Sequence, residues 1–260
     1  MARASCKSKA RIAAAATMTL FMGAAWANAG EIKVLSSVAL TSALDELAPV
    51  FERTSGNKLV IDYGVAAQLK ERFLTGAAAA DVLILTRQLM DDLQKEGKVT
   101  TGSLTNLGGT AVAVVIRAGA LKPDISSVEA FKRAFGSAKS VVYADPAKGG
   151  ASGVYFSRII DRLGLTEQLK AKTILVPGAQ AAEVVAKGEA ELGIAQTSEI
   201  VPVGGAELLG PFPGEIANVT VFTAGISAGS KTPEADKALI QFLRGPIAAP
   251  LLKAKGFELQ

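Results

Sequence analysis

Short polar stretches follow apolar segments at several points of this sequence, and they carry hydroxyl, amide and glycine residues rather than clustered acids. In the stretch VLSSVAL, a strand-like run ends at Ser36 and Ser37, and a helix-like pattern begins at once. At the amino end of a helix the first backbone N–H groups lack partners and the helix dipole is positive, so such junctions attract anions. The chemistry that this pattern predicts is therefore anion binding.

Four further junctions share these features, in the stretches YGVAAQ, DPAKGGASGVY, PGAQ and LGIAQTS. Any one of them is more often a helix cap or a turn than a ligand contact. Together they favour a site, and a tyrosine beside them could equally be a core residue with a bonded hydroxyl. The candidate ligand-binding residues are Ser36, Ser37, Ala39, Ala67, Gln68, Ser152, Gly153, Tyr155, Gln180, Gln196 and Thr197.

The residue types that are missing exclude several kinds of chemistry. The chain has no histidine, and Cys6 is its one cysteine. Catalysis by Ser-His-Asp or Cys-His groups and histidine metal sites are therefore excluded. We expect no metal and no cofactor, and any proton transfer would use Asp, Glu, Lys, Tyr or a water molecule.

Residues 1–29 have the features of a signal peptide. A basic start precedes an apolar run, Ile12–Ala25, and small residues follow at Ala27–Gly30, so we expect cleavage after Ala29 and a periplasmic protein. A membrane anchor is the alternative, but the run is short for a full span. The segment carries four of the 28 basic residues and none of the 24 acidic ones, so the mature chain is neutral (28 − 4 = 24). Neutrality gives no reason to expect nucleic acid as a partner.

The order of strand-like and helix-like segments predicts an α/β fold with two lobes, each a sheet flanked by helices. Two long strands, Thr110–Gly119 and Val219–Gly229, are expected to connect the lobes as a hinge. Residues 30–112 and 222–260 would form the first lobe, and residues 113–221 the second. We expect Pro49 to kink or end the first helix, Ser42 and Asp45 to cap it, and one helix, PEADKALIQFLRG, to close the chain.

Five sequence patterns resemble the periplasmic molybdate-binding proteins of ABC importers. They are V-x-x-x-x-(A/S)-L-T-x-A-L, G-A-x-x-A-D, D-P-x-x-x-x-(S/A)-G-x-Y, K-G-E-x-x-x-G-I and the closing KAKGF. They occur in the right order over the mature chain, and the loop after Asp145 and Pro146 is one residue longer here than in the family pattern. The resemblance implies the type II binding-protein fold, whose lobes close over an oxyanion held by hydroxyls and amides. It also implies a small anion as ligand and an inner-membrane ABC permease as partner. We expect a monomer.

The resemblance is weaker at the residues that would bind the oxyanion. The two positions at which the family places serines are Ala39 and either Ala66 or Ala67, and a family tyrosine is replaced by Gln196. Each lost hydroxyl costs a buried anion on the order of 1.5–3 kcal/mol. We therefore expect a different pocket, better suited to an organic carboxylate than to molybdate.

Two functions follow from these observations. The first is a solute-binding protein that delivers a small anion to an ABC importer. The second is an isomerase similar to aconitate isomerase, which belongs to a related family and would move a proton between trans- and cis-aconitate. Candidate groups for that chemistry are Tyr63, Tyr155, Lys148 and Arg72, although the two cations could equally be solvated surface charges. A DNA-binding regulator is disfavoured by the signal peptide.

Overall fold

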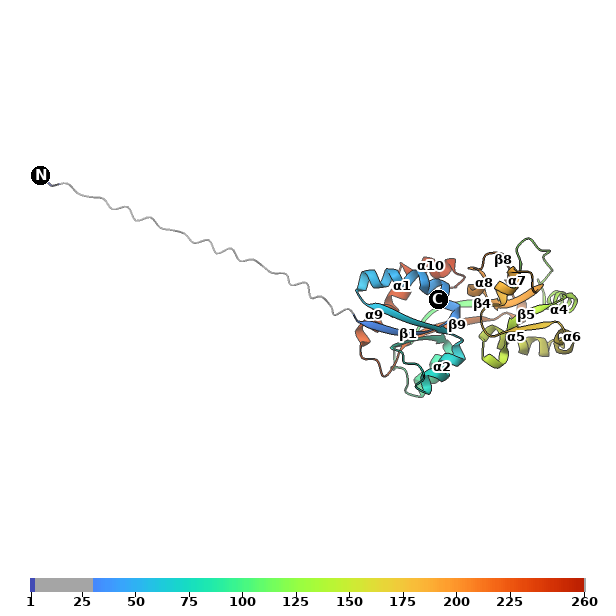
Figure 1. Cartoon of the computed structure of the whole chain (residues 1–260), viewed down its shortest axis with the longest axis horizontal. Helices are drawn as coiled ribbons and strands as arrows, with labels where there is room; N and C mark the ends of the chain where they lie inside the picture. The colour runs from blue at the N-terminus through green and yellow to red at the C-terminus, as the bar shows by residue number, and fades with distance from the viewer. Residues whose placement is uncertain (3–29, 260) are drawn as a thin grey trace.

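The computed structural model describes residues 1–2 and 30–259, so the predicted signal peptide lies almost entirely outside the described residues. Two lobes lie side by side, and the long strands β4 (Thr105–Arg117) and β9 (Val219–Ile226) run between them (Figure 1). The strands follow the order β2-β1-β3-β9-β4-β7-β5-β6, and β8 pairs with β4 off this path. The predicted α/β class with two lobes and two connecting strands is confirmed.

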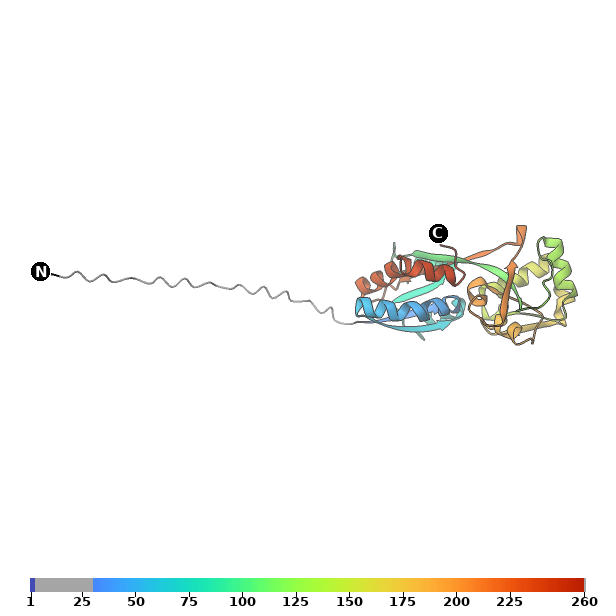
Figure 2. The ribbon, with the colours of Figure 1, turned by 90° about the horizontal axis from the view of Figure 1, so that it is seen from above.

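The first lobe is built on three parallel strands, with β9 antiparallel at their edge. Successive side chains of β1 alternate between faces, so Val34 belongs to one apolar core and Leu35 to the other. Phe51 and Phe242, with ring centroids 5.4 Å apart, join the first helix to the C-terminal helices (Figure 2). The elements are β1 (Glu31–Ser37), η1 (Val38–Leu40), α1 (Thr41–Ser55), β2 (Lys58–Gly64), α2 (Ala66–Leu74), β3 (Val82–Thr86), α3 (Arg87–Lys95), α9 (Pro233–Arg244) and α10 (Ala248–Ala254).

The second lobe repeats this plan with parallel strands β7, β5 and β6. An aromatic cluster that includes Phe131, Phe135, Phe156 and Phe212 fills one face of the sheet, and small aliphatic side chains fill the other. The elements are α4 (Val128–Ser137), β5 (Val141–Ala144), η2 (Pro146–Lys148), α5 (Ala151–Arg162), α6 (Thr166–Lys170), β6 (Thr173–Val176), α7 (Ala181–Ala186), β7 (Leu192–Gln196), α8 (Thr197–Ile200), β8 (Ala206–Pro211) and η3 (Gly214–Ile216).

Strand β4 belongs to both lobes. Its residues from Thr105 to Ala111 pair with β9, and those from Val112 to Val115 pair with β7. The change of partner falls between Ala111 and Val112, one residue before the predicted boundary between residues 112 and 113. The predicted division into 30–112 plus 222–260 and 113–221 stays a prediction.

The structure differs from the local predictions at three places. Helix α1 continues through Pro49 to Ser55, so it does not end early at the proline, and the alternative of a kink there stays a prediction. Ser42 lies inside the helix and does not cap it; Ser37 instead caps the preceding short helix by accepting a hydrogen bond from the Ala39 N–H group. The chain also ends with a second helix, α10, after the predicted one.

Helix α1 tolerates Pro49 because its apolar face is buried on both sides of the proline, at Leu44, Leu47 and Phe51. Proline removes one backbone hydrogen bond and crowds the preceding turn, at a cost of about 3 kcal/mol in a helix interior. The packing of the apolar face offsets this cost.

Replacing the exposed Pro49 should therefore stabilise the protein. We expect Pro49→Ala to raise the free energy of unfolding by about 2 kcal/mol, since the restored hydrogen bond outweighs the added freedom of the unfolded chain. Urea unfolding followed by circular dichroism measures this change. An unchanged or lower stability would show that the helix is already adapted to the proline.

Candidate functional site

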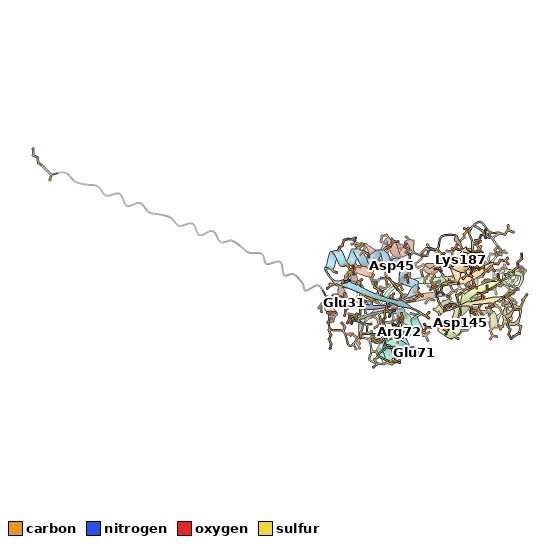
Figure 3. The ribbon with its side chains drawn as sticks, viewed as in Figure 1. Glu31, Asp45, Glu71, Arg72, Asp145 and Lys187 are labelled. Carbon is orange, nitrogen blue, oxygen red and sulfur yellow. The ribbon has the colours of Figure 1, made fainter. Side chains whose placement is uncertain are left out.

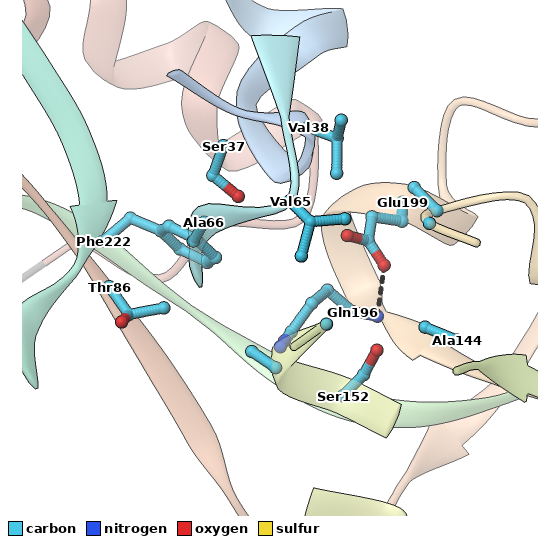
Figure 4. Close-up of a pocket in the computed structure, with 14 residues that line it drawn as sticks. Ser37, Val38, Val65, Ala66, Thr86, Ala144, Ser152, Gln196, Glu199 and Phe222 are labelled. Atoms are coloured by element: carbon cyan, nitrogen blue, oxygen red, sulfur yellow. Dashed lines mark hydrogen bonds between the residues drawn. The ribbon is translucent and has the colours of Figure 1, made fainter. Parts of the chain in front are cut away.

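A cavity lies between the lobes at the carboxyl ends of strands from both sheets. In the first lobe, Ser37 is the last residue of β1 and Thr86 is the last residue of β3. In the second lobe, Ala144 ends β5 and Gln196 ends β7. Ligands of open α/β sheets bind at such strand ends. The inner cavity, as we call it, is lined by Ser37, Val38, Val65, Ala66, Thr86, Ala144, Gly150, Ala151, Ser152, Gly178, Ala179, Gln196, Glu199 and Phe222 (Figure 4).

Two helices begin at the inner cavity, one from each lobe. Helix α2 starts at Ala66 after Val65, and α5 starts at Ala151 after Gly150; all four residues line the cavity. No side chain caps the amino end of either helix. Their first N–H groups therefore remain available to an anion, and both helix dipoles favour negative charge there.

Glycines let the backbones around the cavity approach each other closely. Gly149 has φ +78°, and a Cβ atom placed there would lie 2.6 Å from the Cβ atom of Ala67 in the other lobe. A Cβ atom on Gly153 would lie 1.9 Å from the Ala144 carbonyl oxygen, so α5 sits directly on the end of β5. The role of Gly153 is this close packing, which carries Ser152 to the cavity.

Two serine hydroxyls face the inner cavity from opposite lobes, as Figure 4 shows for Ser37 and Ser152. Ser37 Oγ accepts a 3.4 Å hydrogen bond from the Ala39 N–H group and keeps its own proton to donate. Ser152 is 3% exposed, and its hydroxyl has no hydrogen-bond partner within the described part of the chain. Both hydroxyls can donate to an anion.

Gln196 closes the cavity beside the connecting strands. It is 1% exposed, and its Nε2 atom donates a 2.9 Å hydrogen bond to Thr220 Oγ1 on β9. Its Oε1 atom is buried with no partner among the described residues. A buried acceptor without a partner is costly, so this carboxamide is suited to receive a donor group of a ligand.

Glu199 is the one side chain with a titratable carboxyl group among the described residues that line the inner cavity. Its Oε2 atom accepts a 3.1 Å hydrogen bond from the Gln196 N–H group (Figure 4). Burial raises the pKa of Glu199 to about 7, although this hydrogen bond acts in the opposite direction. Near neutral pH the carboxyl group can therefore either give up or hold a proton. The sequence patterns did not single out Glu199 as a site residue. The one indication was its position three residues after the end of the strand, which is typical of a helix cap.

Two grooves extend the inner cavity on either side. The α3–α5 groove shares Ala66, Thr86 and Ala151 with the cavity, and the α1–α7 groove shares Val38, Val65, Gly178, Ala179 and Glu199 with it. These shared residues make the three spaces neighbours.

The structure distributes the predicted binding residues over these spaces. Ser37, Ser152 and Gln196 line the inner cavity, Ala67 and Tyr155 line the α3–α5 groove, and Gln68 and Gln180 line the α1–α7 groove. Ser36, Ala39, Gly153 and Thr197 line none of the three. Ser36 is fully buried and Thr197 Oγ1 donates to the Ala111 carbonyl at 3.1 Å, so both hold the fold together. Ligand contact by any of these residues stays a prediction.

The candidate groups for proton transfer lie away from the inner cavity. Tyr63 donates to Asp45 Oδ1 at 2.8 Å, and burial together with this acidic partner raises the pKa of Tyr63. Tyr155 donates to the Ile216 carbonyl at 3.1 Å. Arg72, labelled in Figure 3, is exposed and pairs with Asp62, and Lys148 is exposed as well. Glu199, in contrast, lines the inner cavity.

Within the described residues, no group of three or more acidic, histidine or cysteine side chains is placed to hold a metal ion. None of the described helices is long and apolar enough to cross a membrane.

A family comparison agrees with this geometry. The sequence pattern of the family described as bacterial extracellular solute-binding proteins matches residues 32–258. The chain belongs to this family. Among individual relatives of this solute-binding protein, the aconitate isomerase of a Pseudomonas species is 35% identical over 232 residues, which is 87% of this chain and 87% of that protein.

Molybdate-binding proteins are also similar to this solute-binding protein. ModA of Azotobacter vinelandii is 31% identical over 244 residues, covering 90% of this chain and 92% of that protein. The solved structure of a periplasmic molybdate-binding protein of Azotobacter vinelandii matches with a TM-score of 0.71 and 21% identity, covering 88% of this chain and 99% of that chain. The predicted resemblance and the type II binding-protein fold are confirmed.

The raised pKa of Glu199 predicts how the stability of this solute-binding protein depends on pH. Between the ordinary value of 4.5 and about 7, the folded protein holds a proton that the unfolded chain has lost. The free energy of unfolding should therefore fall over this range, on the order of 2–3 kcal/mol for this residue. Glu199→Gln has an uncharged side chain at every pH, so it should remove the part of the pH dependence of the free energy of unfolding that Glu199 causes.

Chemical unfolding of both proteins at pH 5 and pH 8 measures the effect. We expect Glu199→Gln to gain stability relative to the wild type as the pH rises. A constant difference between the two proteins would mean that the carboxyl group is already ionised at pH 5.

Proposed function

We propose that this protein binds a small organic carboxylate anion in the inner cavity, outside the cytoplasm, for delivery to an ABC importer. The observation that carries the proposal is the meeting of two uncapped helix amino ends, with Ser37 and Ser152 beside them, at one cavity between the lobes. Such groups hold an anion through N–H and O–H donors without a formal counter-charge.

The lining of the cavity favours a carboxylate over molybdate. One of the two positions where the resemblance places a serine is Ala66 or Ala67, and neither residue has a hydroxyl group to offer; Ala66 lines the inner cavity and Ala67 lines the α3–α5 groove. Ala39 at the other position is buried outside the cavity. A tetrahedral oxyanion would lose charge-assisted hydrogen bonds worth on the order of 1.5–3 kcal/mol each.

Location and partners belong to the same proposal. Cleavage of the predicted signal peptide after Ala29 would release a neutral protein of 231 residues (260 − 29) into the periplasm. There the protein would act as a monomer, close its lobes over the anion and present the closed form to an inner-membrane permease.

A ligand screen tests this function. Purified mature protein is mixed with molybdate, sulfate, acetate, succinate, tricarballylate and both isomers of aconitate, and thermal unfolding is followed. We expect carboxylates with more than one acid group to raise the unfolding temperature most, because a ligand that binds the folded state stabilises it. Molybdate as the best ligand, or no effect of any anion, would contradict the proposal.

Ser152→Ala should weaken the binding of the best carboxylate roughly 10- to 100-fold, since one charge-assisted donor is lost. Ser157→Ala on the same helix is the matched control, because Ser157 Oγ donates to the Val154 carbonyl and lines none of the three spaces. Calorimetry should show unchanged affinity for this control.

The position of Glu199 favours isomerisation as a second candidate function. A 1,3-proton shift requires a base that removes a proton from the carbon beside a double bond and returns it at the far end of the allylic system. A carboxyl group with a pKa of about 7 suits both steps near neutral pH. The N–H groups at the starts of α2 and α5 can stabilise the negative charge that develops on the substrate carboxylates. The 35% identity to an aconitate isomerase supports the same candidate.

Incubation with trans-aconitate, followed by chromatography for the cis isomer, separates the two candidates. If the protein is an isomerase, turnover should increase as the pH rises through about 7, when Glu199 loses its proton. Glu199→Gln should then lower turnover by roughly 100-fold or more while retaining substrate binding. Binding without turnover in the wild type would leave the solute-binding function alone.

A further inference from the structure

The two grooves beside the inner cavity differ in charge. The α1–α7 groove is lined by Asp45, Glu46, Glu183 and Glu199, and its lining includes no lysine or arginine among the described residues. The α3–α5 groove is lined by three cations and two acids, which are Arg87, Lys95, Arg158, Asp91 and Asp92. An anion that extends beyond the inner cavity is therefore repelled on one side and attracted on the other.

Several charged side chains of the α3–α5 groove already form ion pairs. Arg87 Nε bonds Asp91 Oδ1 at 2.8 Å, and Asp92 lies 3.6 Å from the Lys70 ammonium group on α2. Arg158, in contrast, makes no ion pair and no side-chain hydrogen bond with any residue that the structure describes. Its guanidinium group is available to a ligand.

Helix α5 connects Arg158 to the inner cavity. Ala151, Val154, Tyr155 and Arg158 line the same groove, and their spacing of three, four and seven residues places them on one face of the helix. Ala151 also lines the inner cavity. Seven residues correspond to roughly 10 Å along the helix, and helical side chains lean toward the amino end. The Arg158 side chain therefore leans back toward the cavity.

The surface between these two points carries few competing polar groups. Val154 is apolar, and the hydroxyl group of Tyr155 is already bonded to the Ile216 carbonyl. A ligand that lies along this face meets N–H donors at one end, an apolar stretch in the middle and a guanidinium group at the other end. This order matches a short carbon chain with an acid group at each end.

We propose that Arg158 binds the second carboxylate of a ligand whose first carboxylate lies in the inner cavity. The protein then selects di- and tricarboxylates over monocarboxylates. Arginine suits this role because its planar guanidinium group forms two parallel hydrogen bonds to a carboxylate. The inference rests on the proposed carboxylate-binding function and adds to it the residue that selects ligands with a second carboxylate.

Titration calorimetry with acetate, succinate and tricarballylate tests the inference on the wild type, Arg158→Gln, Arg158→Lys and Arg162→Gln. Arg162 is the matched control, since it is exposed on α5 one turn further on and lines none of the three spaces. We expect Arg158→Gln to weaken the binding of succinate and tricarballylate by roughly 10- to 100-fold and to leave the affinity for acetate unchanged. Arg158→Lys should recover part of the loss, and Arg162→Gln should behave as the wild type.

Two results would overturn the inference in distinguishable ways. In the first case, the wild type binds these acids and Arg158→Gln leaves the ratio of succinate affinity to acetate affinity unchanged. Arg158 then does not bind the second carboxylate, while the proposed function stands. If the wild type binds none of the three acids, the proposed function fails and the inference falls with it.

Discussion

The candidate site depends on the approach of two helix amino ends that no side chain of the described residues caps. Helix α2 brings one end from the first lobe and α5 brings the other from the second, and neither has a side-chain cap. The approach is close because Gly149 has no side chain to separate its backbone from Ala67. Uncapped helix ends at a cavity are stable only where something else satisfies them, so the geometry implies a hydrogen-bond acceptor from outside the chain.

An acidic side chain in a cavity that we propose binds an anion requires an explanation, and burial supplies it. Because burial raises the pKa of Glu199 to about 7, the carboxyl group can remain uncharged beside a bound anion. In that form it donates a hydrogen bond instead of repelling the ligand. Binding and proton transfer can therefore use the same group, which brings a binding protein and an isomerase on this fold chemically close.

The cavity is also tied to the strands that connect the lobes. Gln196 donates to Thr220 on β9, and the Ser198 N–H group donates to Thr110 Oγ1 on β4 at 3.1 Å. Both acceptors lie where β4 and β9 pair with each other between the lobes. A ligand that contacts Gln196 or Glu199 thus acts on the same elements that set the relative position of the lobes. This arrangement suits a protein whose lobes close over its ligand.

Local patterns in the sequence were sufficient for the order of strands and helices and for the junctions that carry Ser37, Ser152 and Gln196. Alternating burial along strands and the apolar faces of helices depend on residues that are close together in the sequence, so they can be predicted without coordinates. Two predicted site residues that line none of the three spaces show the limit of this approach. Ser37 lines the inner cavity and the neighbouring Ser36 does not, because successive strand residues point to opposite faces.

Ala39 was expected at the site because of the resemblance, but it packs into the first lobe. Pro49 remains inside α1 because distant side chains bury both halves of that helix.

The sequence by itself determined an α/β chain without histidine and with anion-attracting junctions. Only the tertiary structure decided that Glu199 would be partly buried at the cavity and that Arg158 would lie along a groove leading from it. In the sequence both look like ordinary surface charges. The environment of a charged group is set by residues far away in the chain, and it becomes defined only when the two lobes pack against each other.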